Sequence, residues 1–296
     1  MPIEDFIISV YCCVADLFSE VLKDIKLRQR GFIPKTTDEE VITIEVIGEF
    51  LGLETDKQIW EYFKRHWTAW FPNLPCRTTF VRQAANLGQV KQSIQRLLAI
   101  RLGALDDSLH IIDGFPIPTC LFARARRGQL FKGEAGYGRC ATKKQVYYGF
   151  KGHLVISGNG IISSLMITSA NVEEHRPVDK LVQGMKGLLI GDKGFISKDL
   201  KERLLRMGID LQTPLKKNMK DERDPQFLIK IKGMRRLIET VIGQLDERFN
   251  FAVVWARDFW HLLGRLSRKA LAHTTGIFLN RQRGNPLLQF DTLLTI

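Results

Sequence analysis

Two short apolar runs, each ended by an aspartate, constrain the fold of this 296-residue chain more than any other feature. The first covers residues 109–113 and ends in Asp113, which Gly114 follows; the second covers residues 188–192 and ends in Asp192. Apolar runs of about five residues without alternation are typical of strands that are buried on both faces of a sheet. Because such a strand delivers its last side chain to the open end of the sheet, the sequence predicts an α/β core with two carboxylates at strand ends.

Periodicity predicts the order of the other core elements. Strands are expected over residues 109–113, 145–157, 160–169, 188–192 and 209–214. The sequence Gly158-Asn159-Gly160 is typical of a hairpin turn. Helices are expected over residues 177–185 and 197–207, and over a later stretch whose apolar stripe runs from Met234 to Leu245. The order βββαβαβα indicates a mixed five-stranded sheet with flanking helices.

Residues 1–105 are predicted to form an all-α N-terminal domain. A capping box at Thr37 and Glu40 starts one helix. A later helix is expected over residues 78–102, with Thr78 or Thr79 as its cap.

The start of that later helix suggests a way to bind DNA. Arg77 and Arg82 lie where a helix-turn-helix places the side chains that contact bases. We therefore expect this domain to bind DNA ends, and an ordinary helical bundle is the alternative. The domain arrangement is completed by the α/β core at 106–250, which carries a basic insertion at 116–145, and by a C-terminal helical extension at 251–296 that we expect to pack on the core.

The net charge of +12 is unevenly distributed along the chain. Residues 1–105 hold thirteen basic and thirteen acidic residues, residues 106–215 hold sixteen and eleven, and residues 216–296 hold fifteen and eight. All of the excess therefore lies in the part that carries the aspartates. A basic field around carboxylates favours a polyanionic partner, because the cations attract a nucleic-acid backbone while the acids hold metal at the reacting phosphate. A generally basic surface is the alternative.

Basic residues concentrate in the insertion, where they alternate with aromatic residues. Such a segment can hold phosphates while its rings stack on unpaired bases, and a long solvated loop is the alternative. For His153 a structural, hydrogen-bonded role is equally compatible with the sequence. The residues that we expect to contact DNA are Arg124, Arg126, Arg127, Lys132, Arg139, Lys143, Lys144, Lys151, His153, Lys193, Arg235, Arg236, Arg77 and Arg82.

Cysteine spacing and hydropathy exclude several other classes of protein. The five cysteines are scattered and lack the paired short spacings of a zinc site or a small disulfide scaffold, which favours a reducing cytoplasm. The apolar stretch at residues 6–15 is too short to span a bilayer and lacks the basic flank of a signal peptide. We therefore expect a soluble, cytoplasmic protein that associates with the bacterial nucleoid when it is bound to DNA.

Five sequence motifs resemble those of bacterial insertion-sequence transposases, specifically family nine-eighty-two. They are Asp113-Gly114-Phe115-Pro116, Tyr148-Gly149-Phe150-Lys151-Gly152-His153, Gly191-Asp192-Lys193-Gly194-Phe195, Arg236-x-Ile238-Glu239-Thr240 and Trp255-Ala256-Arg257-Asp258. The order of elements likewise resembles the RNase H-like core of DDE transposases and retroviral-type integrases.

The resemblance implies a catalytic triad of Asp113, Asp192 and Glu239. It also implies a DNA transposase that binds the terminal inverted repeats of its element, exposes 3′-hydroxyls and joins them to target DNA, acting as a homodimer or a higher multimer. A metal-dependent DNA endonuclease or resolvase, and a non-catalytic DNA-binding protein derived from a transposase, are the alternatives. Lys232 and Asp246 stand where relatives with this core have a tyrosine and a lysine, so the accessory roles of the late helix are not carried over.

Three carboxylates suit the chemistry that the resemblance implies. Two ions of Mg²⁺ or Mn²⁺ prefer oxygen ligands and stabilise both the attacking and the leaving oxygen at phosphorus. Without metal, we expect the carboxylates to repel one another. A polar cluster at residues 171–175, which includes Glu174, is interpreted as helix capping and support for the metal ligands rather than as a source of a fourth acid.

Overall fold

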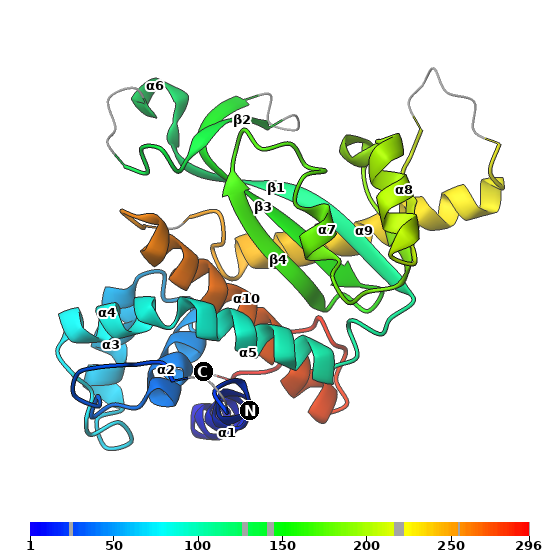
Figure 1. Ribbon diagram of the computed structural model, residues 1–296. Coiled ribbons are helices and arrows are strands. Elements are labelled where there is room, and N and C mark those ends of the chain that lie inside the picture. The colour runs from blue at the N-terminus through cyan, green and yellow to red at the C-terminus, as the bar shows by residue number, and fades with distance from the viewer. Residues whose placement is uncertain (24–25, 126–129, 141–144, 216–221, 254, 296) are drawn as a thin grey trace. The chain divides into compact units, whose positions relative to one another are not determined.

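The computed structural model describes residues 1–23, 26–125, 130–140, 145–215, 222–253 and 255–295 (Figure 1). The chain divides into two compact units. We call Met1–Leu98 with Leu245–Ile296 the helical unit, and Ala99–Gln244 the sheet unit. The sheet unit is therefore inserted, along the chain, between two parts of the helical unit.

The helical unit is built from helices that start and stop largely as their sequence predicts. Its helices are α1 (Ile3–Val21), α2 (Asp38–Phe50), α3 (Asp56–His66), α4 (Arg77–Asn86), most of α5 (Gly88–Arg101) and α10 (Phe259–Gln282). The predicted capping box of α2 is present: the amide of Thr37 donates to Glu40 Oε2 at 2.7 Å, and the amide of Glu40 donates to Thr37 Oγ1 at 3.2 Å. None of the described helices is both long and apolar enough to cross a lipid bilayer.

The single helix predicted over residues 78–102 is two helices in the structure, α4 and α5. The first begins at Arg77 after Cys76, rather than after a threonine cap, and it ends at Asn86; Leu87 separates it from α5, which begins at Gly88. The start of α5 packs closely against α10. A Cβ atom on Gly88 would lie 3.2 Å from the Cα atom of Gly264 in α10, so the two backbones approach closely there.

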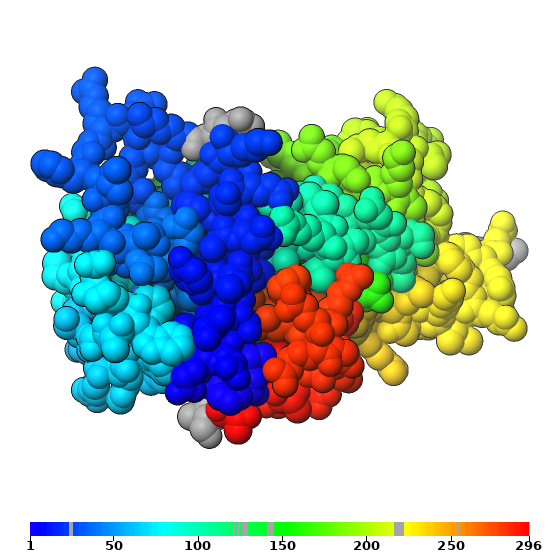
Figure 2. Space-filling view, turned by 90° about the horizontal axis from the view of Figure 1, so that it is seen from below, coloured from blue at the N-terminus to red at the C-terminus, as the bar shows by residue number. Residues whose placement is uncertain are grey.

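Helix α10 corrects the expected packing of the C-terminal extension. Its contacts are with α1, α2 and α4, and the chain from Leu245 onward belongs to the helical unit. The last described residues continue this arrangement, because the Met1 ammonium group donates to the Leu293 carbonyl and the Thr295 amide donates to the Met1 carbonyl, each at 3.0 Å. Figure 2 shows α1 in dark blue beside the C-terminal segment in red.

Buried charges explain why α10 joins these helices. A buried ion-pair network links α2, the first residue of α3, α5 and α10. Its members are Glu45, Glu49, Asp56, Lys91, Arg268 and Lys269. Arg268 Nε lies 2.5 Å from Glu49 Oε1, Lys269 Nζ lies 2.8 Å from Glu49 Oε2, and Arg268 also contacts Asp56. Part of the C-terminal basic excess is therefore neutralised inside the protein instead of facing a polyanion.

The sheet unit confirms the predicted mixed, RNase H-like sheet, with one strand in the basic insertion added to the five that the sequence predicts. In the described residues the sheet has six strands: β1 (Leu109–Leu121), β2 (Gly136–Cys140), β3 (Gln145–Ser157), β4 (Ile162–Ser169), β5 (Gly187–Ile190) and β6 (Ile209–Gln212). The order is β2-β3-β1-β5-β6, and β4 pairs with the same edge of β3 as β2, farther along that strand. The first four strands pair antiparallel, whereas β5 joins β1 and β6 joins β5 in parallel.

Strand β1 is much longer than the expected 109–113. It continues through Pro116 and Pro118 to Leu121, and it remains paired with β3 throughout. Its parallel pairing with β5 ends at Ile111. Beyond that point β1 pairs only with β3 in the described residues, so a proline without an N–H group costs no hydrogen bond on its free side.

Helices cover the sheet and fix the direction of its side chains. The helical elements are α6 (Phe122–Ala125), α7 (Val178–Leu181), the 3₁₀ turn η1 (Lys193–Phe195), α8 (Lys198–Arg206) and α9 (Pro225–Glu247). Ile112 packs in one core cluster with side chains of α7 and α8, such as Leu181 and Leu204. Because side chains alternate along a strand, Ile111 and Asp113 point to the opposite face. In Figure 1, α7 lies in front of the sheet and α9 crosses behind it.

Candidate active site

Parallel pairing brings the two strand-end aspartates together. Ile111 of β1 lies opposite Ile190 of β5, so two further residues along each strand lead to Asp113 and Asp192. Asp113 Oδ1 accepts a hydrogen bond from the amide of Gly114 at 2.8 Å. Asp192 caps η1, because its Oδ1 accepts from the amide of Gly194 at 2.7 Å. Each aspartate thus has one oxygen fixed by its own turn.

The two aspartates influence one another electrostatically. The pKa of Asp113 is raised to about 6, mainly by burial and in addition by the charges of Asp192 and Glu174, against the opposing effects of the Gly114 amide and Arg235. Because Arg235 belongs to α9, its effect on the pKa of Asp113 agrees with an Asp113 side chain that points to the face of the sheet covered by α9. A raised pKa means that the ionised form of Asp113 is unfavourable in this site, and that a nearby positive charge would stabilise the carboxylate.

This raised pKa predicts how stability depends on pH. The pKa of Asp113 in the folded protein, about 6, exceeds its ordinary value of 3.8, so the folded state binds the proton more tightly. The contribution of Asp113 to stability is therefore present below about pH 4 and lost as the pH rises through 6. In metal-free buffer, Asp113→Asn should raise the free energy of unfolding by about 2–3 kcal/mol at neutral pH and change it little near pH 4. Urea unfolding followed by circular dichroism measures both values.

The matched control is Asp106→Asn, which changes an exposed aspartate of the same unit. It should leave the free energy of unfolding unchanged at either pH. An Asp113→Asn variant with the same stability difference at both pH values would contradict the assigned ionisation.

A third carboxylate, Glu174, lies against both aspartate turns. A Cβ atom on Gly114 would lie 3.4 Å from Glu174 Oε1, and one on Gly194 would collide with Glu174 Oε2. Lys151 of β3 lies 3.5 Å from Glu174 Oε1 and donates to the Val172 carbonyl at 3.2 Å. Gly114 and Gly194 therefore leave room for Glu174, which belongs to the polar cluster that the sequence analysis interprets as support for the metal ligands.

The charge of Glu174 gives a second prediction. Since this carboxylate helps to raise the pKa of Asp113, Glu174→Gln should lower that pKa. Carbon-13 NMR titration of the Asp113 carboxyl group in metal-free buffer measures the change. Glu173→Gln is the matched control, because the Glu173 side chain is exposed and pairs with Arg176. Equal titration curves for Glu174→Gln and the unmodified protein would show that Glu174 has no electrostatic influence on the site.

The structure places Glu239 differently from the two aspartates. Glu239 is an exposed residue in the middle of α9, one turn after Arg235, whereas its neighbours Ile238 and Val241 are buried. Across the part of the chain that the structure describes, no three His, Cys, Asp or Glu side chains form a group that could hold a metal ion. The fold therefore brings Asp113 and Asp192 together but does not bring Glu239 into a ligand group with them.

The donor set nevertheless fits a divalent cation in its chemistry. Asp113 and Asp192 supply hard oxygen donors, which Mg²⁺ and Mn²⁺ prefer. Their hydrogen bonds, among the described residues, use only the Oδ1 atom of each. Burial and, to a smaller extent, the charge of Asp192 raise the pKa of Asp113, and a bound cation would offset the repulsion between the two carboxylates.

The expected DNA contacts fall into three groups. Arg126, Arg127, Lys143 and Lys144 lie outside the described residues, as does the side chain of Arg124. Lys151 pairs with Glu174, and Arg235 is half-buried near Asp113. The remaining basic side chains, apart from His153, are exposed and available to a polyanion: Lys132, Arg139, Lys193, Arg236, Arg77 and Arg82.

His153 is corrected from a DNA contact to a structural residue. Its side chain is fully buried, and Nε2 lies 2.8 Å from Thr168 Oγ1. Burial, together with the charge of Lys151, lowers the pKa of His153 to about 4. A buried, neutral imidazole offers neither the access nor the charge to hold a phosphate.

Comparison with known proteins identifies a family for this chain and a solved structure that is similar to it. Residues 104–253 match the family described as "Transposase DDE domain". No curated protein sequence matches this chain. Among solved structures, the chain is similar to the piggyBac transposase of a synaptic complex with hairpin DNA, at 11% sequence identity and a TM-score of 0.44, over 95% of this chain and 75% of that chain.

Proposed function

Since this chain belongs to the Transposase DDE domain family, we propose that it is a DNA transposase that binds the inverted repeats at the ends of its own element. It cleaves the DNA there to expose 3′-hydroxyls and joins them to target DNA. The observation that carries this proposal is the adjacency of Asp113 and Asp192, delivered to one end of the sheet by parallel strands. Insertion-sequence family nine-eighty-two is the branch that its motifs resemble.

Each residue of the site has a role in this chemistry. Asp113 and Asp192 would hold the metal, with Glu239 as a third ligand from α9. Bound Mg²⁺ or Mn²⁺ supplies Lewis-acid stabilisation of the attacking and leaving oxygens at phosphorus. Lys193, exposed directly after Asp192, is positioned to contact the phosphate backbone beside the site. We expect Glu239 to require a movement of α9 toward the aspartates, since it is not in a ligand group with them.

DNA binding would use exposed cations in both units. In the sheet unit these include Arg139 on β2, near the exposed rings of Phe122 and Tyr137, whose centroids are 5.5 Å apart. In the helical unit they are Arg77 and Arg82 on α4. Pairing two element ends requires at least two active sites, so we expect a homodimer or a higher multimer on DNA.

A strand-transfer assay tests the proposal. The substrate is the DNA that flanks the coding region on either side, labelled at its 3′-ends and incubated with the protein, Mg²⁺ and a target plasmid. Joined products are expected with Mg²⁺ and absent with EDTA. Hydrolysis without joining would identify a metal-dependent endonuclease or resolvase, and binding without cleavage would identify a non-catalytic DNA-binding protein. Either result would overturn the proposal.

A further inference from the structure

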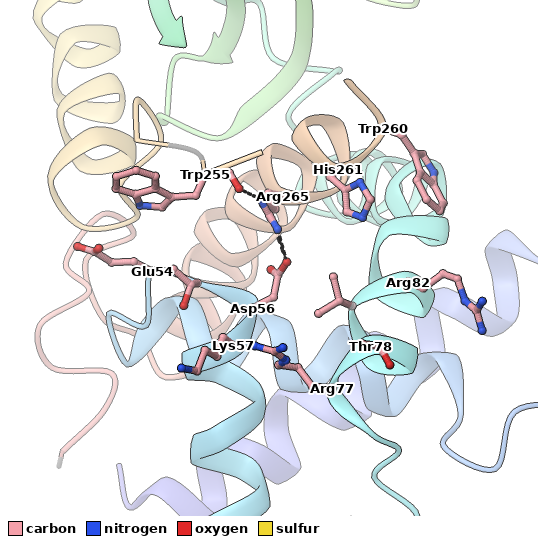
Figure 3. A pocket seen from close by; sticks show the side chains of 12 residues that line it. Glu54, Asp56, Lys57, Arg77, Thr78, Arg82, Trp255, Trp260, His261 and Arg265 are labelled. Carbon is pink, nitrogen blue, oxygen red and sulfur yellow. Dashed lines mark hydrogen bonds and ion pairs between the residues drawn. The ribbon is translucent and has the colours of Figure 1, made fainter. Parts of the chain in front are cut away.

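A pocket of about 570 Å³ opens in the helical unit, apart from the aspartate site (Figure 3). It lies around the first residues of α3, α4 and α10, and all of its lining residues belong to the helical unit. A volume of this size falls within the range of about 300–1,000 Å³ that is usual for small-ligand sites. The pocket has a composition that indicates its ligand.

Two exposed indole rings flank the pocket. Trp255 is 67% exposed and Trp260 is 44% exposed, although tryptophan is highly buried on average. Trp67, by contrast, is buried, and Trp60 Nε1 donates to the Pro75 carbonyl at 2.8 Å. In Figure 3, Trp255 and Trp260 lie on opposite sides of the pocket, with Arg265 and His261 between them. The two rings therefore offer separate flat apolar surfaces to a ligand.

The charges around the rings favour an anion. Arg77 and Arg82 of α4 are exposed, and neither forms an ion pair with any residue that the structure describes. The first turn of α4 contains no acidic residue. Asp56, an acid of the lining, is already neutralised by Arg265, at 2.5 Å, and by Arg268. Glu54 is a further, exposed acid of the lining, and Lys57 pairs with Glu61 at 3.6 Å. Arg77 and Arg82 therefore leave an excess of positive charge at the pocket over the single exposed acid.

Flat aromatic faces beside unpaired cations match the chemistry of nucleotides whose bases are not stacked in a duplex. We propose that this pocket binds a short unpaired stretch of DNA, with bases stacked on Trp255 and Trp260 and phosphates held by Arg77 and Arg82. Intact duplex DNA does not offer these contacts, because each of its base faces is covered by the neighbouring base pairs. The inference rests on the proposed function, since a DNA end that is cut on one strand contains nucleotides that can leave the duplex.

Fluorescence anisotropy with two DNA probes tests the pocket. The probes are an oligothymidine of about twelve nucleotides and a blunt duplex of the same length, both in EDTA. Trp255→Ala and Trp260→Ala should each weaken binding of the oligothymidine about 5- to 100-fold and change duplex binding by less than about twofold. The double variant Arg77→Gln/Arg82→Gln should weaken binding of the oligothymidine and reduce its salt dependence by about one unit of slope per lost phosphate contact.

Trp70→Ala is the matched control, because Trp70 is 43% exposed and lies in the same unit outside the pocket. It should bind both probes like the unmodified protein. The inference would be overturned if Trp255→Ala and Trp260→Ala both bound the oligothymidine with unchanged affinity, or if they lost equal affinity for the duplex and the oligothymidine. Because these measurements exclude metal and cleavage, they can fail while strand transfer succeeds, and the reverse also holds.

Discussion

Asp192→Asn should abolish metal-dependent cleavage of element-end DNA while leaving the affinity for that DNA within about twofold of the original. The asparagine keeps the Oδ1 acceptor that caps η1 through the Gly194 amide, at 2.7 Å in the unmodified protein, so the turn should fold unchanged. What is lost is the negative charge that would hold a metal ion. Since such an ion stabilises the transition state by several kcal/mol, the single-turnover cleavage rate should fall by about a thousandfold or more.

The control for this variant is Asp210→Asn, on the neighbouring strand β6, whose carboxylate is exposed and accepts from its own neighbour Gln212. It should cleave at the original rate. Binding is measured by gel shift in EDTA, and cleavage with Mg²⁺. An Asp192→Asn protein that retains more than about a tenth of its cleavage rate would remove Asp192 from the catalytic site.

Arg268→Met should destabilise the helical unit by about 3–5 kcal/mol. Arg268 is fully buried and contacts Glu49, Glu45 and Asp56, so its removal leaves these carboxylates with too little compensating charge. Burial opposes the ionisation of Asp56, but Arg268 and Arg265 hold its pKa below the usual range, so Asp56 depends on this cation. All five tryptophans lie in the helical unit, and urea unfolding followed by their fluorescence therefore measures this unit.

Two further variants distinguish charge pairing from simple packing. Arg283→Met changes an exposed arginine directly after α10 and should leave the unfolding midpoint unchanged. The double variant Arg268→Met/Glu49→Gln should recover part of the lost stability, because it removes one of the uncompensated acids. If Arg268→Met unfolds at the same urea concentration as the unmodified protein, the network does not stabilise the unit.

The sequence predicted the core best where the signal is local. The strand at 145–157, the helix expected over 197–207 and the capping box at Thr37 all depend on residues within one element, and the structure has each of them. The continuation of β1 past Pro116 was not predictable in this way. It depends on β5 ending at Ile190, which is set by another part of the chain.

Contacts across long sequence separations account for what was missed. Glu45 and Arg268 each contributed only to a count of charges, and nothing local indicates that residues 223 positions apart form a buried pair. The sequence placed Glu174 in a polar cluster that supports the metal ligands, but it did not identify this carboxylate as the one that lies against both aspartate turns. A usable signal existed, because Gly114 and Gly194 each follow an aspartate closely, and paired glycines at such positions indicate that another group needs the space.

The insertion of one unit into the other also has a consequence for the order in which this protein matures. During synthesis from the N-terminus, residues 1–98 emerge first, but the cations of α10 that neutralise Glu49 and Asp56 arrive only after the whole sheet unit has been made. Until then, Lys91 is the basic member of the network that is available to the three acids Glu45, Glu49 and Asp56. The buried ion-pair network of the helical unit therefore cannot be completed until translation has passed Lys269.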